Sequence, residues 1–430
     1  MNAAGLYPDG SLTGMLSHVA LPQMYLAQQT MEDRQLSDAA AEACLRQSLA
    51  PLLAGVRSGM RIGITVGSRG IDRLVLGLRV LCGMLADRGA AVFLVPCMGS
   101  HGVDARGRVC LLEGLGVTAE TVPAEIVSDD EVVCLGSACN GQPVYVDRFL
   151  MECDGVIVLN RVKPHTAFHA PVESGLQKMM AVGMGKQKSA AVCHRGGFEG
   201  MYEHVTASAR AILATGKILL GVALVENAFG HLCELHVLPA REIPAREPEI
   251  LRRARDYMPS IPFSRADVLV VAEMGKDISG SGMDTNVIGR YPTAGLTGTF
   301  SADKLAVLSL TAASAGNFHG VGFADFISRR LFAAMDLEHT YPNGLTNKTV
   351  GPAKIPPVMP DDRCAIQAAL LTCRRSDEAE PEMILIKNTH DLKTFYVTKS
   401  LISKALRPLT VSPVPAALQF DGEGTLSNLW

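Results

Sequence analysis

The sequence predicts an α/β protein of two α/β domains, and three observations carry that prediction. Short apolar segments at 61–66, 91–96 and 155–159 have the length and composition of buried strands. Glycine-containing turns follow the first two segments, and stretches with apolar residues at helical spacing, 71–88 and up to 115, come next. Strand, turn, helix and strand in this order are typical of a parallel sheet with crossover helices. We therefore expect a mainly parallel, Rossmann-like sheet in the N-terminal domain.

Proline-containing segments between 239 and 262 indicate a hinge near 255–265. A chain of 430 residues is long enough for two or three domains. We expect an N-terminal α/β domain, 1–260, a C-terminal α/β domain, 261–430, and an active site in the cleft between them. The other expected elements are helices at 33–55, 202–215, 301–313, 321–335 and 360–374, and strands at 217–225, 266–272 and 382–386.

Composition excludes several classes of function. The formal net charge is −3 and no run of Lys or Arg occurs, which argues against a nucleic-acid partner. Hydrophobic residues make up 48% of the chain, but no apolar run is long enough to span a bilayer. The eleven cysteines include no Cys-x-x-Cys pair, which argues against a disulfide framework and a zinc ribbon. With no secretion signal at the start, we expect a cytoplasmic protein.

Polar residues follow three predicted strands at the point where each strand ends. Ser68 and Arg69 follow the first strand, and His101 lies in a glycine-flanked turn after the second. His165 comes after Lys163 and Pro164, beyond the third. Ligands of open parallel sheets bind beyond the carboxyl ends of the strands, so the three loops are expected to converge on one site. The alternative for His101 is a histidine in a solvent-exposed turn.

Two further residues have chemistry that suggests an enzyme. Lys178 lies in a mostly apolar stretch, where burial would make its amine a nucleophile. The alternative is a lysine whose stem lies along the surface. His194 can hold a metal through a neutral ring nitrogen. A metal pair of His165 and His169 would need a helix, which the prolines around them disfavour.

A glycine-rich loop at 275–282 matches neither the Gly-x-Gly-x-x-Gly pattern nor a Walker loop. No dinucleotide fingerprint follows the first strand either. The sequence therefore argues against an ordinary NAD-dependent dehydrogenase.

Four segments taken together resemble the nickel-dependent lactate racemase family: Met98 to Gly102, Asn160 to His165, Glu173 to Lys178, and Glu273 to Arg290. The resemblance covers residues 60 to 400 approximately. It implies a nickel pincer nucleotide, a modified pyridinium mononucleotide whose sulfur and carbon atoms hold nickel. The N-terminal domain would then bind this cofactor.

The resemblance also implies a role for each candidate residue. Lys178, in a Ser-Gly-x-x-Lys run, would carry the cofactor covalently. Ser68, Ser174 and Gly175 would contact it, and His194 would be a nickel ligand. The acid/base pair would be His101 and His165, and Arg69 would bind the substrate carboxylate.

The sequence departs from the family in two places. An Asp-x-Thr-Arg run is usual, but this chain has Val66-Gly-Ser-Arg69 and lacks the acidic residue. The second domain usually supplies a Gln and a Lys near the substrate, where this chain offers Asn286 and Arg290 as substrate-binding residues. Both departures put lactate itself in doubt as the substrate.

The resulting hypothesis is an isomerase, a racemase or epimerase that abstracts a hydride from a small-molecule 2-hydroxy acid and returns it. Its partners would be cofactor-biosynthesis enzymes. The alternatives are a nickel-independent oxidoreductase or lyase acting on a hydroxy acid, and a non-catalytic nucleotide-binding protein.

Overall fold

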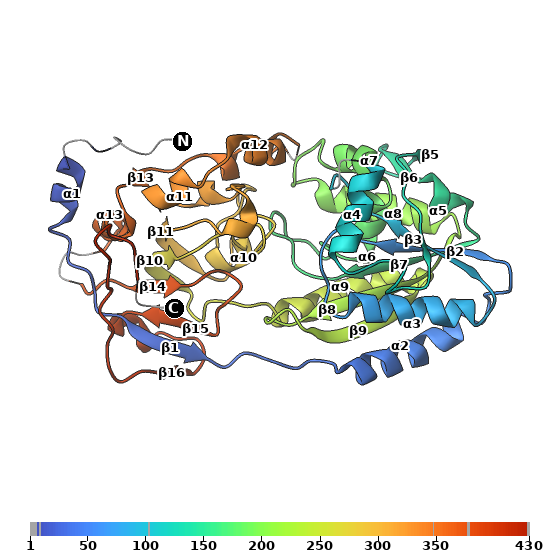
Figure 1. Ribbon diagram of the computed structural model, residues 1–430, viewed down its shortest axis with the longest axis horizontal. Coiled ribbons are helices and arrows are strands. Elements are labelled where there is room, and N and C mark those ends of the chain that lie inside the picture. Colours follow the sequence, from blue (N-terminus) through green and yellow to red (C-terminus); the bar gives the residue numbers. More distant parts are fainter. Residues whose placement is uncertain (1–6, 8–9, 102–103, 347, 376–378, 428–430) are drawn as a thin grey trace. The chain divides into compact units, whose positions relative to one another are not determined.

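The computed structural model describes residues 7, 10–101, 104–346, 348–375 and 379–427. The chain divides into two compact units (Figure 1). We call Glu32–Met258 the central unit, and Met1–Met31 together with Pro259–Trp430 the terminal unit. Each unit is an α/β structure with its own mixed, mostly parallel sheet.

The central unit contains a six-stranded sheet in the order β4-β3-β2-β7-β8-β9. All neighbouring strands are parallel except β8 and β9. The four strands predicted from the sequence in this unit are therefore confirmed. The bounds are β2 (Arg61–Val66), β3 (Ala91–Pro96), β4 (Glu125–Ile126), β7 (Gly155–Arg161), β8 (Ile218–Glu226) and β9 (Leu232–Pro239), with a separate antiparallel pair, β5 (Val132–Ser137) and β6 (Pro143–Asp147).

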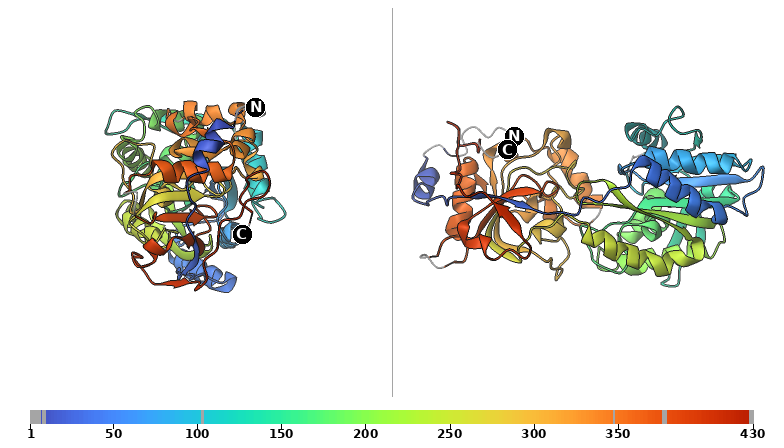
Figure 2. Two further views of the ribbon diagram at one scale, coloured as in Figure 1. Left: turned by 90° about the vertical axis from the view of Figure 1, so that its left-hand side faces the viewer. Right: turned by 90° about the horizontal axis from the view of Figure 1, so that it is seen from below.

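Helices cover both faces of this sheet. On one face, α2 (Asp38–Leu52), α3 (Leu74–Ala86) and α4 (Ala105–Gly114) bury apolar side chains against β2, β7 and β8. On the other face, α8 (Met201–Leu213) and α9 (Ile243–Asp256) pack in a second core. Figure 2 (right) shows α2 and α3 in blue on one side of the strands and α9 in yellow-green on the other. The shorter helices are α5 (Arg148–Glu152), α6 (Leu176–Lys178) and α7 (Lys186–Cys193), with a π-helical turn at Met179–Gly183.

The sequence did not predict β9 or α9, and α9 lies within the region between 239 and 262 that was interpreted as a hinge. Pro244 lies in the first turn of α9, where the helix needs no N–H donor. Pro248 is accommodated inside the same helix. A proline at a helix start has therefore been taken for a break.

The terminal unit contains an eight-stranded sheet in the order β13-β12-β11-β10-β14-β15-β1-β16. The first five strands are parallel to their neighbours, and the last three join antiparallel. The strands are β10 (Arg265–Val271), β11 (Ser301–Val307), β12 (Phe326–Ser328), β13 (Val358–Met359), β14 (Met383–Ile386), β15 (Thr394–Val397), β1 (Tyr25–Gln29) and β16 (Leu409–Val411). The helices are α1 (Ser11–Leu16), α10 (Thr285–Ile288), α11 (Arg329–Ala333), α12 (Leu337–Thr346), α13 (Asp362–Thr372) and α14 (Lys399–Ile402).

Two predicted helices of this unit are wrong. The segment expected as a helix at 301–313 contains β11, a central strand. The segment 321–335 contains a 3-10 turn, β12 and the short α11 rather than one helix. Short apolar runs fit a buried strand and a buried helix equally well by periodicity, which explains both errors.

The predicted domain bounds also need a correction at the start of the chain. β1 pairs with β15 and β16, so residues up to Met31 belong to the terminal unit and not to an N-terminal domain of 1–260. Pairing between segments this distant in sequence leaves no local pattern.

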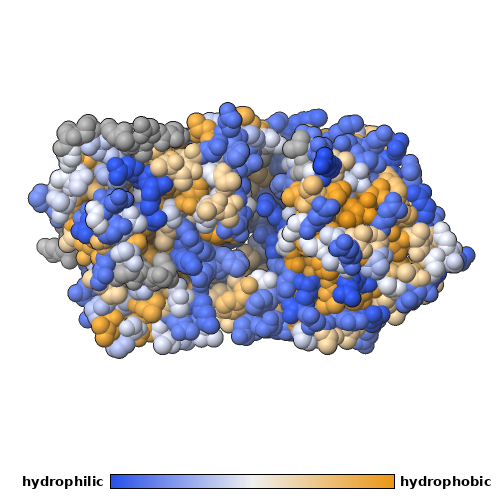
Figure 3. Space-filling view, in the orientation of Figure 1, coloured by the Kyte–Doolittle hydropathy of each residue, from blue (hydrophilic) through white to orange (hydrophobic). Residues whose placement is uncertain are grey.

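Hydrophobic residues on the face in Figure 3 form several separate patches among hydrophilic ones. None of the helices in the described part of the chain is long and apolar enough to cross a membrane.

We predict that Gly320→Ala destabilises the terminal unit more than Gly295→Ala. Both glycines have left-handed backbones, with φ of +110° and +77°. A Cβ at Gly320 would lie 1.7 Å from the carbonyl oxygen of Ser281, whereas nothing lies within 4 Å of one at Gly295. Backbone strain plus overpacking should lower the free energy of unfolding by roughly 2–5 kcal/mol at Gly320, against about 1–2 kcal/mol of strain alone at Gly295. Equal losses in denaturant titrations would contradict this packing.

Candidate active site

Three loops of the central unit leave the sheet at one edge, because β3, β2 and β7 are parallel neighbours (Figure 1). Ser68 and Arg69 follow β2, and His101 follows β3. The Ser68 hydroxyl lies 3.0 Å from Nδ1 of His101, which joins these two loops directly. His165 follows β7.

The segment that carries Lys178 is held against the end of β7. Lys163 and Ser174 form an antiparallel bridge, with N–H to carbonyl distances of 3.0 and 3.3 Å. The side-chain amide of Asn160 donates to the Gly175 carbonyl at 2.9 Å. Lys178 ends α6, and the chain continues into the π-helical turn. Such turns are rare and are frequent at functional sites.

The π-helical turn also packs closely against the loop that carries His101. A Cβ on Gly183 would lie 2.8 Å from the carbonyl oxygen of Cys97. One on Gly99 would lie 3.2 Å from the Val182 side chain. Glycine at both positions therefore lets the Lys178 segment and the loop after β3 approach each other.

Lys178 is a desolvated amine among other cations. Burial is the main cause that lowers the pKa of Lys178 to about 8; the charges of Lys163 and Arg69 act in the same direction, and Cys193 and Glu173 oppose them. Among the described residues, neither the Lys178 ammonium nor the Arg69 guanidinium has a hydrogen bond or an ion pair. Two cationic groups thus remain open to an anionic ligand at the edge of the sheet.

His165 is held in one orientation by its own loop. The Ala167 N–H donates to Nδ1 of His165 at 3.0 Å, so the neutral ring carries its proton on Nε2. The ring lies against Phe168, with centroids 4.6 Å apart. Burial, with Lys178 and Lys163 nearby, holds the pKa of His165 well below its usual range. The imidazole is therefore neutral at neutral pH.

A buried carboxylate shapes the loop that carries His165. Glu173 is 1% exposed. It accepts hydrogen bonds from the main-chain N–H groups of His165 at 2.6 Å and of Ala170 at 2.9 Å. Arg255, at the end of α9, forms an ion pair with Glu173 and donates to the Ala170 carbonyl at 2.9 Å. The carboxylate is thus both paired and hydrogen-bonded, as a buried charge must be.

His194 ends α7 as its C-terminal cap. Cys193, directly before it, is the last residue of that helix. The His194 ring packs edge-on against Phe198, with centroids 5.5 Å apart, and Phe198 also contacts His165 at 5.8 Å. The phenyl ring therefore lies against both imidazoles. No group of three or more His, Cys, Asp or Glu side chains within the described ranges is arranged to hold a metal.

The two candidate residues of the terminal unit have partners inside that unit. Arg290 donates to Asp325 at 2.6 Å and to three main-chain carbonyl oxygens at 2.6 to 3.2 Å. A guanidinium with these bonds has a structural role, which weakens its assignment to the substrate. Asn286 is bound through its side chain to Asp284 at 2.9 Å and to Tyr291 at 3.2 Å. The interdomain active site and the substrate roles of these residues stay predictions.

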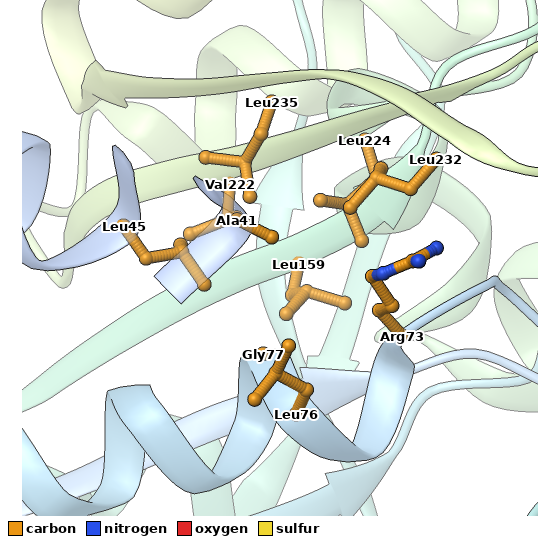
Figure 4. A pocket seen from close by; sticks show the side chains of 10 residues that line it. All are labelled: Ala41, Leu45, Arg73, Leu76, Gly77, Leu159, Val222, Leu224, Leu232 and Leu235. Atoms are coloured by element: carbon orange, nitrogen blue, oxygen red, sulfur yellow. The ribbon is translucent and has the colours of Figure 1, made fainter. Parts of the chain in front are cut away.

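The central unit also has an apolar cavity, which is separate from the candidate site (Figure 4). Aliphatic side chains of α2, α3, β7, β8 and β9 line it. The one charged lining residue, Arg73, is paired with Asp38 and Asp72. This lining does not fit a charged nucleotide, so the cavity is not a competing candidate for the site.

The comparisons with known proteins concern the same part of the chain. Residues 25–204 match the family model of the lactate racemase N-terminal domain. All candidate residues of the central unit, from Ser68 to His194, lie within the matched range.

A solved structure, the lactate racemase apoprotein from Thermoanaerobacterium thermosaccharolyticum, aligns with 90% of this chain and 91% of its own at 12% identity, with a TM-score of 0.46. The search of curated proteins found no match.

Sequence reasoning missed Arg255 and Glu247, which both lie on α9, and gave Glu173 no role of its own. Glu247 occupies a position on the apolar face of α9 between Ile243 and Ile250. A carboxylate at a buried helical position is a detectable pattern, but only once the helix itself has been predicted.

We predict that Lys178 reacts with a small amine-reactive reagent, such as acetic anhydride, and that its labelling rate rises with pH with a midpoint near pH 8. Burial and neighbouring cations disfavour the ammonium form, so the free amine appears at a lower pH than in an ordinary lysine, at about 10.4. Peptide mass spectrometry across a pH series measures this, with the exposed Lys188 as internal reference for the reagent. A Lys178 midpoint above pH 10 would contradict the described burial.

Proposed function

We propose that this protein is a racemase or epimerase of a 2-hydroxy acid that uses a nickel pincer nucleotide attached through Lys178. The observation that carries the proposal is the unpaired, desolvated amine of Lys178 beside Arg69 and the imidazole of His165. The match of residues 25–204 to the lactate racemase N-terminal domain supports it, because that similarity suggests an isomerase.

The described residues fit such a cofactor. A mononucleotide is anionic, and Lys178 and Arg69 are cations without an ion pair among the described residues. The free-amine form of Lys178 is accessible near pH 8, as formation of a covalent bond to its nitrogen requires. In this cofactor, sulfur and carbon atoms of the nucleotide itself would hold the nickel, so only one ligand from the protein is needed. His194 would be that ligand, and Ser68 and Ser174 would line the bound nucleotide.

The cofactor, when bound, supplies a hydride acceptor and donor, which no side chain can provide. The protein's own residues would then bind the substrate and move its hydroxyl proton. Arg69 presents a guanidinium fork that suits a carboxylate, so it would bind the acid group. Loss of a hydride from C2 leaves a planar 2-oxo acid, and return to the opposite face inverts the centre. Each enantiomer therefore needs its own base for the hydroxyl proton.

His101 and His165 would be these bases, and the structure gives them different starting states. Nδ1 of His101 faces the Ser68 hydroxyl, which can accept a hydrogen bond from a protonated Nδ1. In that tautomer Nε2 carries the lone pair that takes the substrate proton. His165 holds its proton on Nε2, because Nδ1 accepts from Ala167. For His165 to take a proton at Nε2, the ring must first carry its proton on Nδ1 instead, which means giving up the bond from Ala167.

The proposed substrate class is a 2-hydroxy acid, and the proposal does not specify the side chain of that acid. The missing acidic residue before Arg69 argues that lactate itself is not the substrate. Loading would need partner enzymes that make the cofactor.

The attachment and metal assignments can be tested together. After coexpression with cofactor-making enzymes, the wild type should carry a covalent mass adduct on the peptide with Lys178, and Lys178→Ala should lack it. His194→Ala should keep the adduct but lose nickel by elemental analysis, because one ligand change on a helix end rarely unfolds a domain. Lys188→Ala serves as the control for both. An adduct on Lys178→Ala protein would refute the attachment site.

We predict that His101→Ala and His165→Ala each lower turnover by roughly 10²–10⁴-fold, the usual worth of a positioned acid or base. The measurement is racemisation of a panel of 2-hydroxy acids, followed in both directions by chiral chromatography. His204→Ala, an exchange of a histidine outside the loop cluster, is the control. Unchanged rates in both directions for His101→Ala would show that the two-base mechanism is wrong.

A further inference from the structure

Glu247 is a buried carboxyl group that the proposed chemistry does not use. Its side chain lies on α9 and is 1% exposed. It forms no ion pair among the described residues, although a buried carboxylate without a cation costs several kcal/mol. Burial accordingly raises the pKa of Glu247 to about 7. A group this unfavourable in the core must have hydrogen bonds that compensate for it.

Those hydrogen bonds all come from the turn in front of Lys178. The main-chain N–H of Gln177 lies 3.0 Å from one carboxyl oxygen of Glu247 and 3.4 Å from the other. The main-chain N–H of Leu176 also donates to this carboxyl group. These are the first N–H groups of α6, which have no partner within the helix. Glu247 therefore fixes where α6 begins, two residues before its last residue, Lys178.

The same carboxyl group explains the glycine of the Ser-Gly-x-x-Lys run. A Cβ on Gly175 would lie 1.9 Å from Oε1 of Glu247. The φ of Gly175 is 170°, extended backbone that any residue adopts, so its conformation does not require glycine. Glycine is required at this position because the Glu247 carboxyl group occupies the space that a side chain would need.

We infer that Glu247 is a positioning residue for Lys178, and that Gly175 is a glycine to admit the Glu247 carboxyl group rather than to contact a cofactor. Glu247 holds the start of α6 from the core side, and this keeps the Lys178 amine in its desolvated position. The inference deepens the proposed function, since it matters for attachment only if Lys178 is the attachment point. The contacts themselves belong to the protein without cofactor, and so does the first test.

The test is a double-mutant cycle of Gly175→Ala and Glu247→Ala, read by acetic anhydride labelling of Lys178 in the cofactor-free protein. Gly175→Ala alone should displace α6 and raise the labelling midpoint from about pH 8 towards that of an ordinary lysine, about 10.4. Labelling at pH 8 should then fall by at least about tenfold, the size of a coupling between contacting residues. In the Glu247→Ala background, the same Gly175→Ala change should have little further effect, because the clash is gone.

Equal effects of Gly175→Ala in both backgrounds would overturn the inference. If Gly175→Ala fails to fold, recovery of folding in the double variant supports it, and continued misfolding overturns it. Glu247→Gln provides a second measurement, because it keeps the volume but turns an NH₂ group towards the N–H donors. It should slow labelling at pH 8 where Glu249→Gln, on the exposed side of α9, does not; an unchanged rate would count against Glu247.

Cofactor loading separates this inference from the proposed function. If the wild type never carries an adduct on Lys178, the proposed function fails, while the labelling cycle still decides the role of Glu247. If the adduct forms, and Gly175→Ala abolishes it only when Glu247 is present, both stand. Loss of the adduct in Gly175→Ala whichever residue occupies position 247 would instead assign Gly175 to the cofactor and overturn the inference.

Discussion

The candidate site depends on one electrostatic constraint: the Lys178 amine is buried, and other cations lie near it. Burial is the largest cause of the low pKa of Lys178, and the charges of Lys163 and Arg69 act in the same direction. The folded chain tolerates this arrangement because the lysine can lose its proton near pH 8. An anionic ligand bound there would relieve the repulsion. A desolvated amine among cations opposes folding, and such perturbed groups are typical of functional sites.

The carboxyl groups near these cations accept hydrogen bonds from main-chain N–H groups instead. Glu173 binds N–H groups of the His165 loop, and Glu247 binds N–H groups at the start of α6. Both depend on α9, which provides Glu247 itself and also Arg255, the partner of Glu173. One helix on the far side of the sheet from α2 and α3 thus fixes the two segments that carry His165 and Lys178.

The sequence predicts the parts of this architecture that have local patterns. Strands β2, β3, β7 and β8 are apolar runs bounded by turns, and the residues that follow three of them lie at one edge of the sheet. Pairing of β1 with β15, and the strand at β11, depend on distant partners and leave no such pattern. α9 was missed because Pro244 was read as a break, and with it went Glu247 and Arg255. The importance of a buried carboxylate is invisible until the helix that buries it is known.

The two imidazoles also show what sequence cannot specify about chemistry. A motif places His101 and His165 after neighbouring strands, but the location of each proton is set by partners that no motif includes. The Ser68 hydroxyl can accept a hydrogen bond from a protonated Nδ1 of His101. By contrast, Nδ1 of His165 accepts a hydrogen bond from the Ala167 N–H and therefore carries no proton. In the proposed mechanism, two such unequal bases need not treat the two enantiomers alike, although the equilibrium constant is fixed by the substrate. The loop at Ala167, held by Glu173, would then affect which direction is faster as well as where the ring lies.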